Sequence, residues 1–399
     1  MKETSATLIK KEERRQNETI NLIASENYPS QKVRSHLSSI LSSKYAEGYP
    51  EKRYYAGCDV VDEIENLAID LAKKLFKTKY ANVQPHSGSN ANLASYHAIL
   101  TPGQKILAPR LDCGGHLTHG SPASITSKIW QFQHYGVDEN GLFNYEEIRK
   151  QAKKFKPNLI IAGTSAYPLS IDWKKFRQIA DEVGAYLLAD IAHLSGLIVG
   201  GAHKNPSPFA HIITTTTQKT LRGPRGGLIL SNDTEIAKKI DKAIFPKLQG
   251  GPHMQTIASK AECLSEASTK EFRKYISQVI KNSKTLHKEL VKLGCTMWSK
   301  NTETHLTNFN TVKSFGLTGK KAEEILEKNG IIVNREAMPY DEKPPTETSG
   351  IRLGTPAMTT RGMKEKDMKK IAQMIVFILK DNKNLKKEIK FMAKKFSLN

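Results

Sequence analysis

The sequence predicts an α/β protein whose larger lobe contains a mostly parallel sheet with helices on both faces. Short apolar segments at 158–162, 184–190, 210–213 and 228–230 have the composition of buried strands, and helical segments such as 173–183 alternate with them. That order is typical of parallel strands joined by helices. A chain of 399 residues is too long for one compact core of ordinary size, so we also expect a second, smaller lobe.

Composition restricts the class of protein. Hydrophobic residues make up 38% of the chain, and no apolar run approaches the length of a membrane helix, so we expect a soluble protein without a membrane partner. The charged N-terminal segment lacks the apolar stretch of a secretory signal, which predicts a cytoplasmic location. The cysteines at 58, 113, 263 and 295 have no metal-binding spacing, so we expect reduced thiols and no metal site.

The chain is strongly basic. Lysine and arginine outnumber aspartate and glutamate by 61 to 40, which gives a formal net charge of +21. The excess is spread along the chain and lacks interleaved aromatic residues. We therefore expect a solvated, lysine-rich surface that favours anionic small ligands, and we do not expect a nucleic-acid partner.

One lysine follows a run of threonines. Segment 214–227 contains four threonines, then Lys219, and then a turn rich in glycine and arginine. Four β-branched residues favour an extended chain, and the glycines end it, so Lys219 is expected at a strand end. Beside Arg222 and Arg225, and partly desolvated, its pKa should fall, as a Schiff-base amine requires. A solvated basic loop is the alternative.

The apolar segment 184–190 ends in a carboxylate, Asp190. Functional residues of α/β proteins gather at the carboxyl ends of buried parallel strands. An aspartate there can keep the ring nitrogen of pyridoxal phosphate (PLP) protonated, which makes the ring a better electron sink. Asp190 followed by Lys219 is thus the minimum pair that this cofactor requires.

Motifs spread along the chain resemble those of serine hydroxymethyltransferases, PLP enzymes with the aspartate-aminotransferase-like fold (fold type I). They occur in that family's order: Leu22-Ile-Ala-Ser-Glu-Asn-Tyr28, Lys44-Tyr-Ala-Glu-Gly-Tyr-Pro50, Arg53-Tyr-Tyr55, Pro85-His-Ser-Gly-Ser89, Gly114-Gly-His-Leu-Thr-His-Gly120, 214–227 and Ser349-Gly-Ile-Arg-Leu-Gly-Thr-Pro-Ala357. The resemblance runs from about residue 21 to 361. It implies an N-terminal arm at a subunit interface (1–45), a large PLP-binding domain with a seven-stranded type of sheet (46–275) and a small α+β domain (276–399).

The resemblance also implies an activity. Enzymes of this family transfer the hydroxymethyl carbon of L-serine to tetrahydrofolate in a reversible reaction that gives glycine and 5,10-methylenetetrahydrofolate. PLP would be held on Lys219 as an aldimine, and tetrahydrofolate would be the co-substrate. The expected assembly is a cytoplasmic homodimer with shared active sites, or a tetramer built from dimers, in glycine–serine interconversion and one-carbon metabolism.

Site residues follow from the same resemblance. The expected catalytic residues are Lys219, Glu47, Asp190 and His116; Glu47 would handle a proton at the substrate hydroxyl, and His116 would stack on the cofactor ring. The expected cofactor contacts are Tyr45, Ser87, Gly88, Ser89, His116, Ser165, Asp190, His193, Thr216, Gln218, Lys219, Gly250 and Gly251. The expected substrate contacts are Ser25, Tyr45, Glu47, Tyr54, Tyr55, His193 and Arg352. The expected folate contacts are Leu111, Gly114, Gly115, Leu117 and Glu336.

Elementary chemistry agrees with two of these roles. Ser87, Gly88 and Ser89 lie where a helix begins, and the N–H groups of a helix N-terminus favour a phosphate. An ordinary serine N-cap is the alternative. The guanidinium of Arg352 suits a carboxylate, because it can donate two parallel hydrogen bonds. Glu47, by contrast, would pass for a solvated surface residue without its motif.

Several residues depart from the family's pattern. Gln218 replaces a histidine before the lysine, and Glu336 replaces an asparagine that faces the pteridine; Cys113, Lys247, Gln255 and Thr346 are further departures. We therefore expect intact cofactor and amino-acid binding with weakened folate binding. Two alternatives are a folate-independent PLP aldolase acting on 3-hydroxy amino acids, and a catalytically weakened protein of this fold with a basic nucleic-acid-binding surface.

Overall fold

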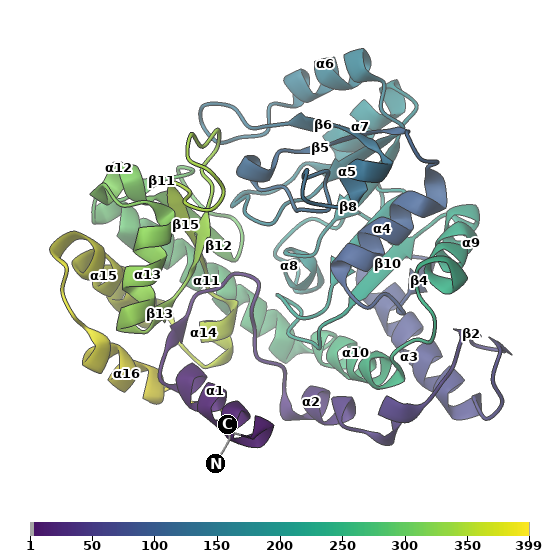
Figure 1. The fold of residues 1–399 in the computed structure, drawn as a ribbon, viewed down its shortest axis with the longest axis horizontal. Coiled ribbons are helices and arrows are strands. Elements are labelled where there is room, and N and C mark those ends of the chain that lie inside the picture. The colour runs from purple at the N-terminus through teal and green to yellow at the C-terminus, as the bar shows by residue number, and fades with distance from the viewer. Residues whose placement is uncertain (1–3, 399) are drawn as a thin grey trace. The chain divides into compact units, whose positions relative to one another are not determined.

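The computed structural model describes residues 4–398 and divides them into two compact units. The large unit is Asn27–Ile276, and the small unit combines the described residues of Met1–Glu26 with those of Ser277–Asn399. The segment before Asn27 thus belongs to the same unit as the C-terminal part of the chain (Figure 1). A role of residues 1–45 at a subunit interface stays a prediction.

The large unit is built on a seven-stranded sheet in the order β4-β10-β9-β8-β7-β5-β6. Its strands are β4 (Tyr80–Asn82), β5 (Lys105–Pro109), β6 (Gln131–Tyr135), β7 (Leu159–Ala162), β8 (Tyr186–Asp190), β9 (Ile212–Thr216) and β10 (Gly227–Ser231). The pairs from β6 to β9 are parallel. The predicted mostly parallel sheet is therefore confirmed.

Strand β10 is antiparallel to both of its neighbours, β9 and β4. The expectation that segment 228–230 continues the parallel series is wrong. Only residues 217–226 connect β9 to β10, and a parallel crossover needs a dozen or more residues, usually with a helix. The chain therefore turns back directly, and Lys219 lies in that turn.

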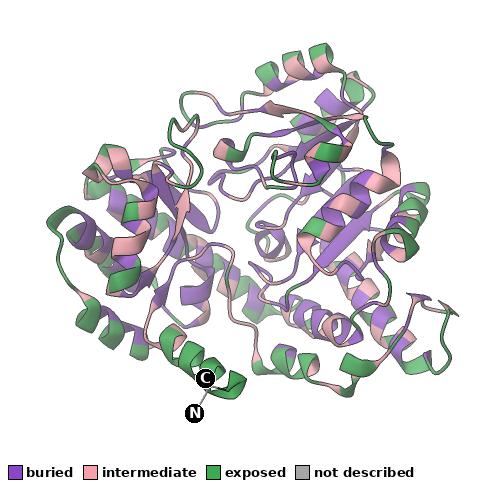
Figure 2. Cartoon of the chain, in the orientation of Figure 1, coloured by how far each residue is buried: buried purple, intermediate pink, exposed green. Residues whose placement is uncertain are grey.

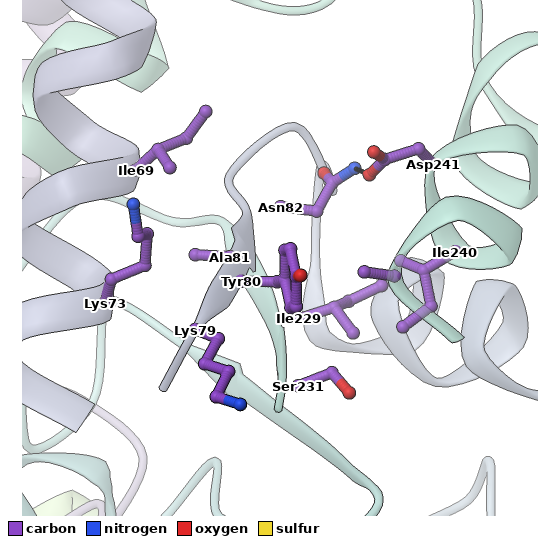
Figure 3. A pocket seen from close by; sticks show the side chains of 11 residues that line it. Ile69, Lys73, Lys79, Tyr80, Ala81, Asn82, Ile229, Ser231, Ile240 and Asp241 are labelled. Carbon is purple, nitrogen blue, oxygen red and sulfur yellow. Dashed lines mark hydrogen bonds between the residues drawn. The ribbon is translucent and has the colours of Figure 1, made fainter. Parts of the chain in front are cut away.

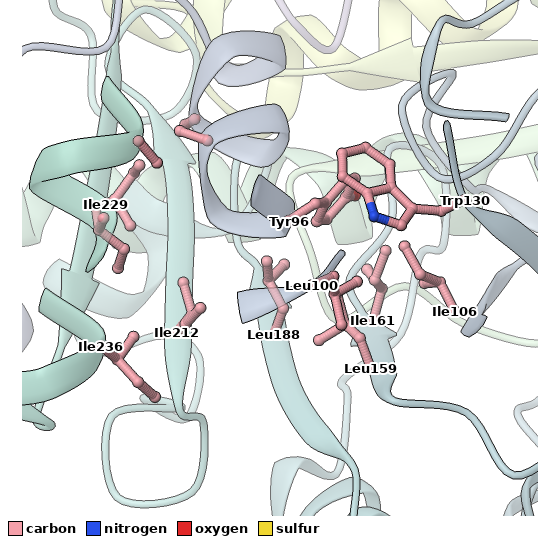
Figure 4. Close-up of a cluster of buried hydrophobic side chains, with 14 of the residues drawn as sticks. Tyr96, Leu100, Ile106, Trp130, Leu159, Ile161, Leu188, Ile212, Ile229 and Ile236 are labelled. Carbon is pink, nitrogen blue, oxygen red and sulfur yellow. The ribbon is translucent and has the colours of Figure 1, made fainter. Parts of the chain in front are cut away.

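Helices cover both faces of this sheet. The helices of the large unit are α2 (Gln31–Leu37), α3 (Asp59–Phe76), α4 (Gly88–Ile99), α5 (Thr126–Ile129), α6 (Tyr145–Phe155), α7 (Trp173–Glu182), α8 (Ser195–Val199), α9 (Thr234–Lys242) and α10 (Met254–Ala267). A core cluster joins residues of α4 and α9, such as Ala94 and Ile236, to alternate strand residues such as Ile161 and Ile212 (Figure 4). The period of two along each strand directs the intervening residues to the opposite face, where Phe176 of α7 contacts Tyr135.

The small unit contains a four-stranded antiparallel sheet in the order β11-β12-β15-β14. Its strands are β11 (Thr296–Met297), β12 (Leu306–Asn310), β14 (Asn334–Glu336) and β15 (Gly350–Gly354). Its helices include α1 (Ser5–Asn17), α12 (Thr311–Phe315), α13 (Gly319–Asn329), α14 (Pro356–Thr360), α15 (Glu365–Asp381) and α16 (Lys386–Lys394). Helix α11 (Lys270–Lys292) contains the boundary between the units, and β1 (Ile20–Asn21) pairs in parallel with β13 (Ile331–Ile332).

Burial differs sharply among the helices. Helix α15 buries one face, which includes Ile371, Ile375 and Ile378, as its apolar periodicity predicts. Helix α1 has no buried residue, and Figure 2 shows it as an exposed element.

Within residues 4–398, no helix is long and apolar enough to cross a membrane. All four cysteines are buried, and none of them forms a disulfide bond.

Candidate active site

Lys219 lies in the turn that follows strand β9. The Thr217 carbonyl closes this turn by accepting a hydrogen bond from the Gly223 N–H at 2.8 Å. The Lys219 carbonyl accepts hydrogen bonds from the Asn27 side-chain amide at 2.9 Å and from the Arg222 N–H at 3.1 Å. Lys219 is only 9% exposed, so the structure places this lysine at a strand end and away from bulk water.

Gln218 precedes this lysine. Its side-chain carbonyl accepts a hydrogen bond from the Gly226 N–H at 3.4 Å, across the same turn. An amide can make this contact, but it cannot become a cation near neutral pH as a histidine can. The structure thus gives Gln218 a positioning contact in the turn that carries Lys219.

Asp190 ends strand β8, the neighbour of β9, and pairs in register with Thr214. One carboxylate oxygen, Oδ2, accepts a hydrogen bond from the Asn92 amide at 2.9 Å and lies 3.0 Å from His119 Nε2, while Oδ1 accepts one from the Ala192 N–H at 3.0 Å. Burial alone would raise the pKa of Asp190, but the hydrogen bond and charge of His119 hold it well below its usual range. Asp190 is therefore a buried anion.

His119 and Asn92 were not among the predicted site residues. Loop 114–120 was expected to contribute its first histidine, His116, as the residue stacking on the cofactor. The structure shows that the second histidine orients Asp190, while His116 Nδ1 lies 2.8 Å from the Thr118 hydroxyl. The motif that contains His119 was the signal for it; no local pattern marks Asn92, which reaches Asp190 from helix α4.

Helix α4 begins at the edge where these strands end. The Ser87 hydroxyl caps the helix by accepting a hydrogen bond from the Asn90 N–H at 3.2 Å. A methyl group on Gly88 would lie 2.6 Å from the Thr216 side chain, so only glycine fits this close approach to strand β9. The first turn of α4, including Ser89, therefore lies beside the end of the strand that leads to Lys219.

Two further predicted residues lie at the same edge. The Ser165 hydroxyl, just after β7, donates to the carbonyls of Gly114 and Gly115, each at 3.2 Å. His193 is only 4% exposed, and its carbonyl accepts a hydrogen bond from the Thr220 hydroxyl at 3.1 Å. These contacts connect the segment after β7 to the segment after β5, and the segment after β8 to the turn after β9, at the edge of the sheet where ligand sites of α/β proteins are expected.

Glu47 lies in a loop whose backbone accepts hydrogen bonds from a buried arginine, Arg53. The Arg53 guanidinium donates to the carbonyls of Ala46 and Gly48, on either side of Glu47, each at 2.9 Å. It also pairs with Glu65 at 2.7 Å, and the side chains of this pair are 3% and 1% exposed. Because an unpaired buried guanidinium is costly, Glu65 fixes Arg53, and Arg53 fixes the backbone that carries Glu47.

The same network connects the Glu47 loop to the start of α4. The Gln84 amide donates to Glu65 at 2.8 Å and to the Gly48 carbonyl at 2.9 Å. The Gln249 side chain then joins two more backbone groups, by donating to the Gln84 carbonyl at 3.0 Å and accepting from the His86 N–H at 3.0 Å. The glycines that follow Gln249 therefore lie near this network.

Gly250 and Gly251 contact residues of the Glu47 loop. A methyl group on Gly250 would lie 3.4 Å from a Glu47 carboxylate oxygen, and one on Gly251 would lie 3.1 Å from the Tyr45 ring. Tyr45 in turn lies 5.3 Å from Tyr55, between ring centroids. The predicted tyrosines are exposed on this chain: Tyr45 by 59%, Tyr54 by 76% and Tyr55 by 45%.

Arg352 and Glu336 belong to the small unit. Arg352 lies on β15, and its Nε donates a hydrogen bond to the side-chain oxygen of Asn334 at 3.1 Å. Its Nη1 lies 3.5 Å from a carboxylate oxygen of Glu336 on the neighbouring strand β14. Burial raises the pKa of Glu336, and Arg352 opposes that rise. Ser25, also in this unit, lies in the turn after β1.

The predicted folate residues fall into two groups. Leu111, Gly114, Gly115 and Leu117 lie together in the segment after β5, where Leu111 is 39% and Leu117 is 52% exposed. Glu336 lies in the small unit and contacts Arg352. The folate role of all five stays a prediction. Of the other departures from the family pattern, Cys113 is buried and Thr346 is exposed.

A cavity of about 200 Å³ opens elsewhere in the large unit, between α3, β4 and α9. Figure 3 shows its lining, in which Asp241 bonds to the Asn82 amide. None of the predicted site residues lines this cavity.

Among residues 4–398, no group of three or more histidine, cysteine, aspartate or glutamate side chains is arranged to hold a metal ion.

Comparison with known proteins identifies the family. A family model described as serine hydroxymethyltransferase matches residues 2–375. Proteins named "Probable serine hydroxymethyltransferase" from Mesomycoplasma hyopneumoniae strains 232 and 7448 are each 50% identical over 398 residues, which cover 98% of this chain and 95% of each relative. With its strand-end lysine, its buried aspartate and this match over nearly its whole length, the chain belongs to the serine hydroxymethyltransferase family.

Proposed function

We propose that the cluster around Lys219 and Asp190 is the site at which this chain transfers the hydroxymethyl carbon of L-serine to tetrahydrofolate. The family's reaction gives glycine and 5,10-methylenetetrahydrofolate, with PLP as cofactor and tetrahydrofolate as co-substrate. One observation carries the assignment of the site. A buried lysine lies in the turn after β9, and the adjacent strand β8 ends in an aspartate that His119 keeps ionised.

The residues present fit PLP. Lys219 offers a shielded amine, and anionic Asp190 suits a protonated ring nitrogen. The first turn of α4 suits the phosphate, since the N–H groups of a helix N-terminus favour an anion and Gly88 allows this turn to approach strand β9 closely. When bound, PLP supplies an electron sink for breaking the bond between Cα and Cβ of serine.

The chain's own residues bind, orient and move protons. Asp190 holds a proton on the ring nitrogen. His119 and Asn92 keep the Asp190 carboxylate from rotating. Arg352 binds the substrate carboxylate and so fixes the orientation of the amino acid. Glu47 moves the proton of the substrate hydroxyl, and Arg53 positions the backbone on both sides of it.

Reduction with borohydride tests the role of Lys219. In the purified holoenzyme it should fix the cofactor's absorbance to the peptide that contains Lys219, and Lys219→Arg should lose this label. Lys260 is a sharp internal control, because it is fully buried and its burial lowers its pKa to about 7. Label on the Lys260 peptide, or label that survives Lys219→Arg, would contradict the assignment.

Folate dependence separates the transferase from a folate-independent aldolase. Serine turnover should require tetrahydrofolate, whereas an aldolase would cleave 3-hydroxy amino acids equally well without it. We also propose that folate binds more weakly than in relatives with an asparagine at position 336, because a carboxylate replaces an amide donor there. Ordinary tetrahydrofolate affinity in a spectral titration with glycine would reject that part.

We also propose a cytoplasmic homodimer, alone or paired into a tetramer, in which residues 1–45 and the tyrosines of the Glu47 loop complete the neighbouring subunit's site. Support comes from exposed apolar side chains on the large unit, including Ile40 at 88%, Tyr54 at 76% and Leu67 at 55%. Leu67 also lines a groove of about 590 Å³ between α2, α3 and α10. Exposed apolar patches of this kind mark interaction surfaces.

A further inference from the structure

Arg352 already holds a carboxylate of its own chain. Strands β14 and β15 are antiparallel, with Asn334 opposite Arg352 and Glu336 opposite Gly350. Asn334 and Glu336 are two residues apart, so their side chains emerge on the same face as that of Arg352. The diagonal neighbour in such a sheet lies within reach of a long side chain. The register of this sheet therefore brings the Glu336 carboxylate to the Arg352 guanidinium.

Asn334 joins the two charged groups. Its side-chain oxygen accepts from Arg352 Nε at 3.1 Å, and its side-chain nitrogen donates to Glu336 Oε2 at 3.2 Å. The same Glu336 oxygen lies 3.5 Å from Arg352 Nη1. The side chains of Arg352 and Glu336 are only 10% and 15% exposed, so water screens their attraction poorly.

The pair is close but not tight. Its 3.5 Å separation is longer than the roughly 2.7–2.9 Å of a good charge-assisted hydrogen bond between a guanidinium and a carboxylate. An incoming α-carboxylate that makes two such bonds would bind Arg352 more strongly than Glu336 does. The Glu336 carboxylate must nevertheless be displaced before the α-carboxylate can bind. Glu336 is thus placed to reduce the affinity of Arg352 for a carboxylate without blocking it.

We propose that Glu336 is an internal competitor for the substrate's carboxylate and thereby sets the affinity of the enzyme for amino acids. The inference rests on the proposed role of Arg352 in binding that carboxylate. It gives Glu336 an effect on amino-acid binding that is separate from its expected contact with folate. It also concerns only ligands that carry a carboxylate, which makes it testable.

The decisive variant is Glu336→Gln, which removes the charge and keeps the shape. Two ligands are compared in the holoenzyme: glycine, and 2-aminoethanol, which has serine's amine and hydroxyl but no carboxylate. We expect the dissociation constant of glycine to fall roughly ten-fold, the size of one charge-assisted competing contact. That of 2-aminoethanol should change less than about two-fold. Glycine should also raise the melting temperature more in the variant than in the wild type.

A matched control lies in the same unit. Glu323 pairs with Arg335 at 2.7 Å and is 22% exposed, so Glu323→Gln removes the same charge from an ion pair that does not include Arg352. It should leave both dissociation constants unchanged. If Glu336→Gln folds poorly, Glu336→Asn offers a second neutral side chain and should shift glycine binding in the same direction.

Arg352→Gln distinguishes the two ways of failing. It should weaken glycine binding strongly and 2-aminoethanol binding little, and adding Glu336→Gln to it should then have no further effect. If Arg352→Gln affects both ligands equally, the proposed role of Arg352 is wrong. If Arg352→Gln behaves as expected but Glu336→Gln leaves glycine binding unchanged or weaker, only the competition is overturned, and Glu336 instead supports the arginine.

Discussion

At the scale of single residues, the site depends on charges placed out of reach of water. Lys260 of α10 departs from what charged side chains usually do, because it is only 1% exposed. Its ammonium donates to the carbonyls of Val83 at 2.6 Å, and of Pro85 and Gly227 at 3.0 Å each. It therefore ties the segment before α4 to strand β10, close to the proposed phosphate site.

Replacing Lys260 should change both stability and its pH dependence. Lys260→Met leaves three buried carbonyls without this donor. We expect the free energy of unfolding to fall by roughly 3 kcal/mol. Burial lowers the pKa of Lys260 from 10.5 to about 7. Between pH 7 and pH 10.5, Lys260 is protonated in the unfolded chain but largely neutral in the folded one. The free energy of unfolding should therefore increase as the pH rises above about 7, and this gain should be lost as the pH falls back to about 7.

Urea unfolding of wild type and variant from pH 7 to pH 9 measures this difference. In Lys260→Met, the free energy of unfolding should rise less steeply with pH than in the wild type, because the contribution of Lys260 is gone. Lys239→Met changes an exposed lysine of α9 and should show the wild-type dependence on pH. Identical slopes in wild type and Lys260→Met would show that Lys260 keeps its proton across this range.

Sequence reasoning at this scale finds residues that local pattern marks. Lys219 and Asp190 lie at strand ends because β-branched and apolar runs lead up to them, and glycines or polar residues follow. Asn92 and Lys260 act through contacts between segments far apart in the chain. Pairings of that kind have no local signature, so no single stretch of sequence could reveal them.

At the scale of elements, the Glu47 loop depends on one buried arginine. Residues 44–55 contain only the two-residue strands β2 (Gly48–Tyr49) and β3 (Lys52–Arg53), which hold little structure by themselves. Arg53 supplies what the short strands lack, since it bonds to two loop carbonyls and to Asp62 and Glu65 on α3. Helix α3 thus sets the position of Glu47.

Arg53→Lys should therefore impair catalysis more than binding. A lysine keeps the charge but cannot make the several directed bonds of the guanidinium, so the loop should shift. A misplacement of about 1 Å typically costs on the order of 100-fold in rate, and we expect kcat to fall by about 10- to 100-fold with KM changed less than about three-fold. Steady-state kinetics with serine and tetrahydrofolate measures both.

Arg149→Lys is the matched control, because Arg149 pairs on the surface with Glu146 and Glu182. It should leave both constants unchanged. An Arg53→Lys enzyme with the wild-type kcat would mean that the backbone around Glu47 is held by other contacts.

The elements themselves could largely be predicted, but their directions and partners could not. Apolar composition located β7, β8, β9 and β10, and the helical segment 173–183 located α7. Strand β10 has the apolar composition of a parallel strand, and only the short connection from β9 makes it antiparallel. Strand β1 is two residues long and pairs with a strand some 300 residues later, and such a strand has no periodicity to detect.

At the scale of the whole molecule, the large unit leaves apolar side chains in water. Ile40 is the most exposed of them at 88%, and its neighbour Leu41 lines the groove between α2, α3 and α10. An isolated chain gains nothing from this exposure, whereas a second copy could cover it. The sequence alone did not separate these residues from the core, because Leu67 fits the apolar face of α3 and is nevertheless 55% exposed.

Ile40→Asp should therefore weaken assembly without unfolding the chain. A charge placed in a buried interface lacks a partner, while the same charge on an exposed monomer surface costs little. We expect the dimer dissociation constant to rise by at least about ten-fold, and activity to fall with it at low protein concentration. Sedimentation velocity across a dilution series measures the change.

Phe391→Asp is the comparison, because Phe391 is also exposed, at 66%, but lies on α16 of the small unit. It should leave the assembly intact. A wild-type chain that sediments as a monomer, or an Ile40→Asp chain that assembles normally, would remove the support for a dimer through this surface.

The parallel pairing of β1 with β13 has a consequence for biosynthesis. The Ile20 N–H donates to the Gly330 carbonyl at 2.9 Å, and the Leu22 N–H donates to the Ile332 carbonyl at 2.8 Å. While a ribosome extends the chain, residues 27–276 can form their own core as soon as they emerge, because that unit is continuous. The segment made first must wait, unpaired, until most of the remaining polypeptide has been translated.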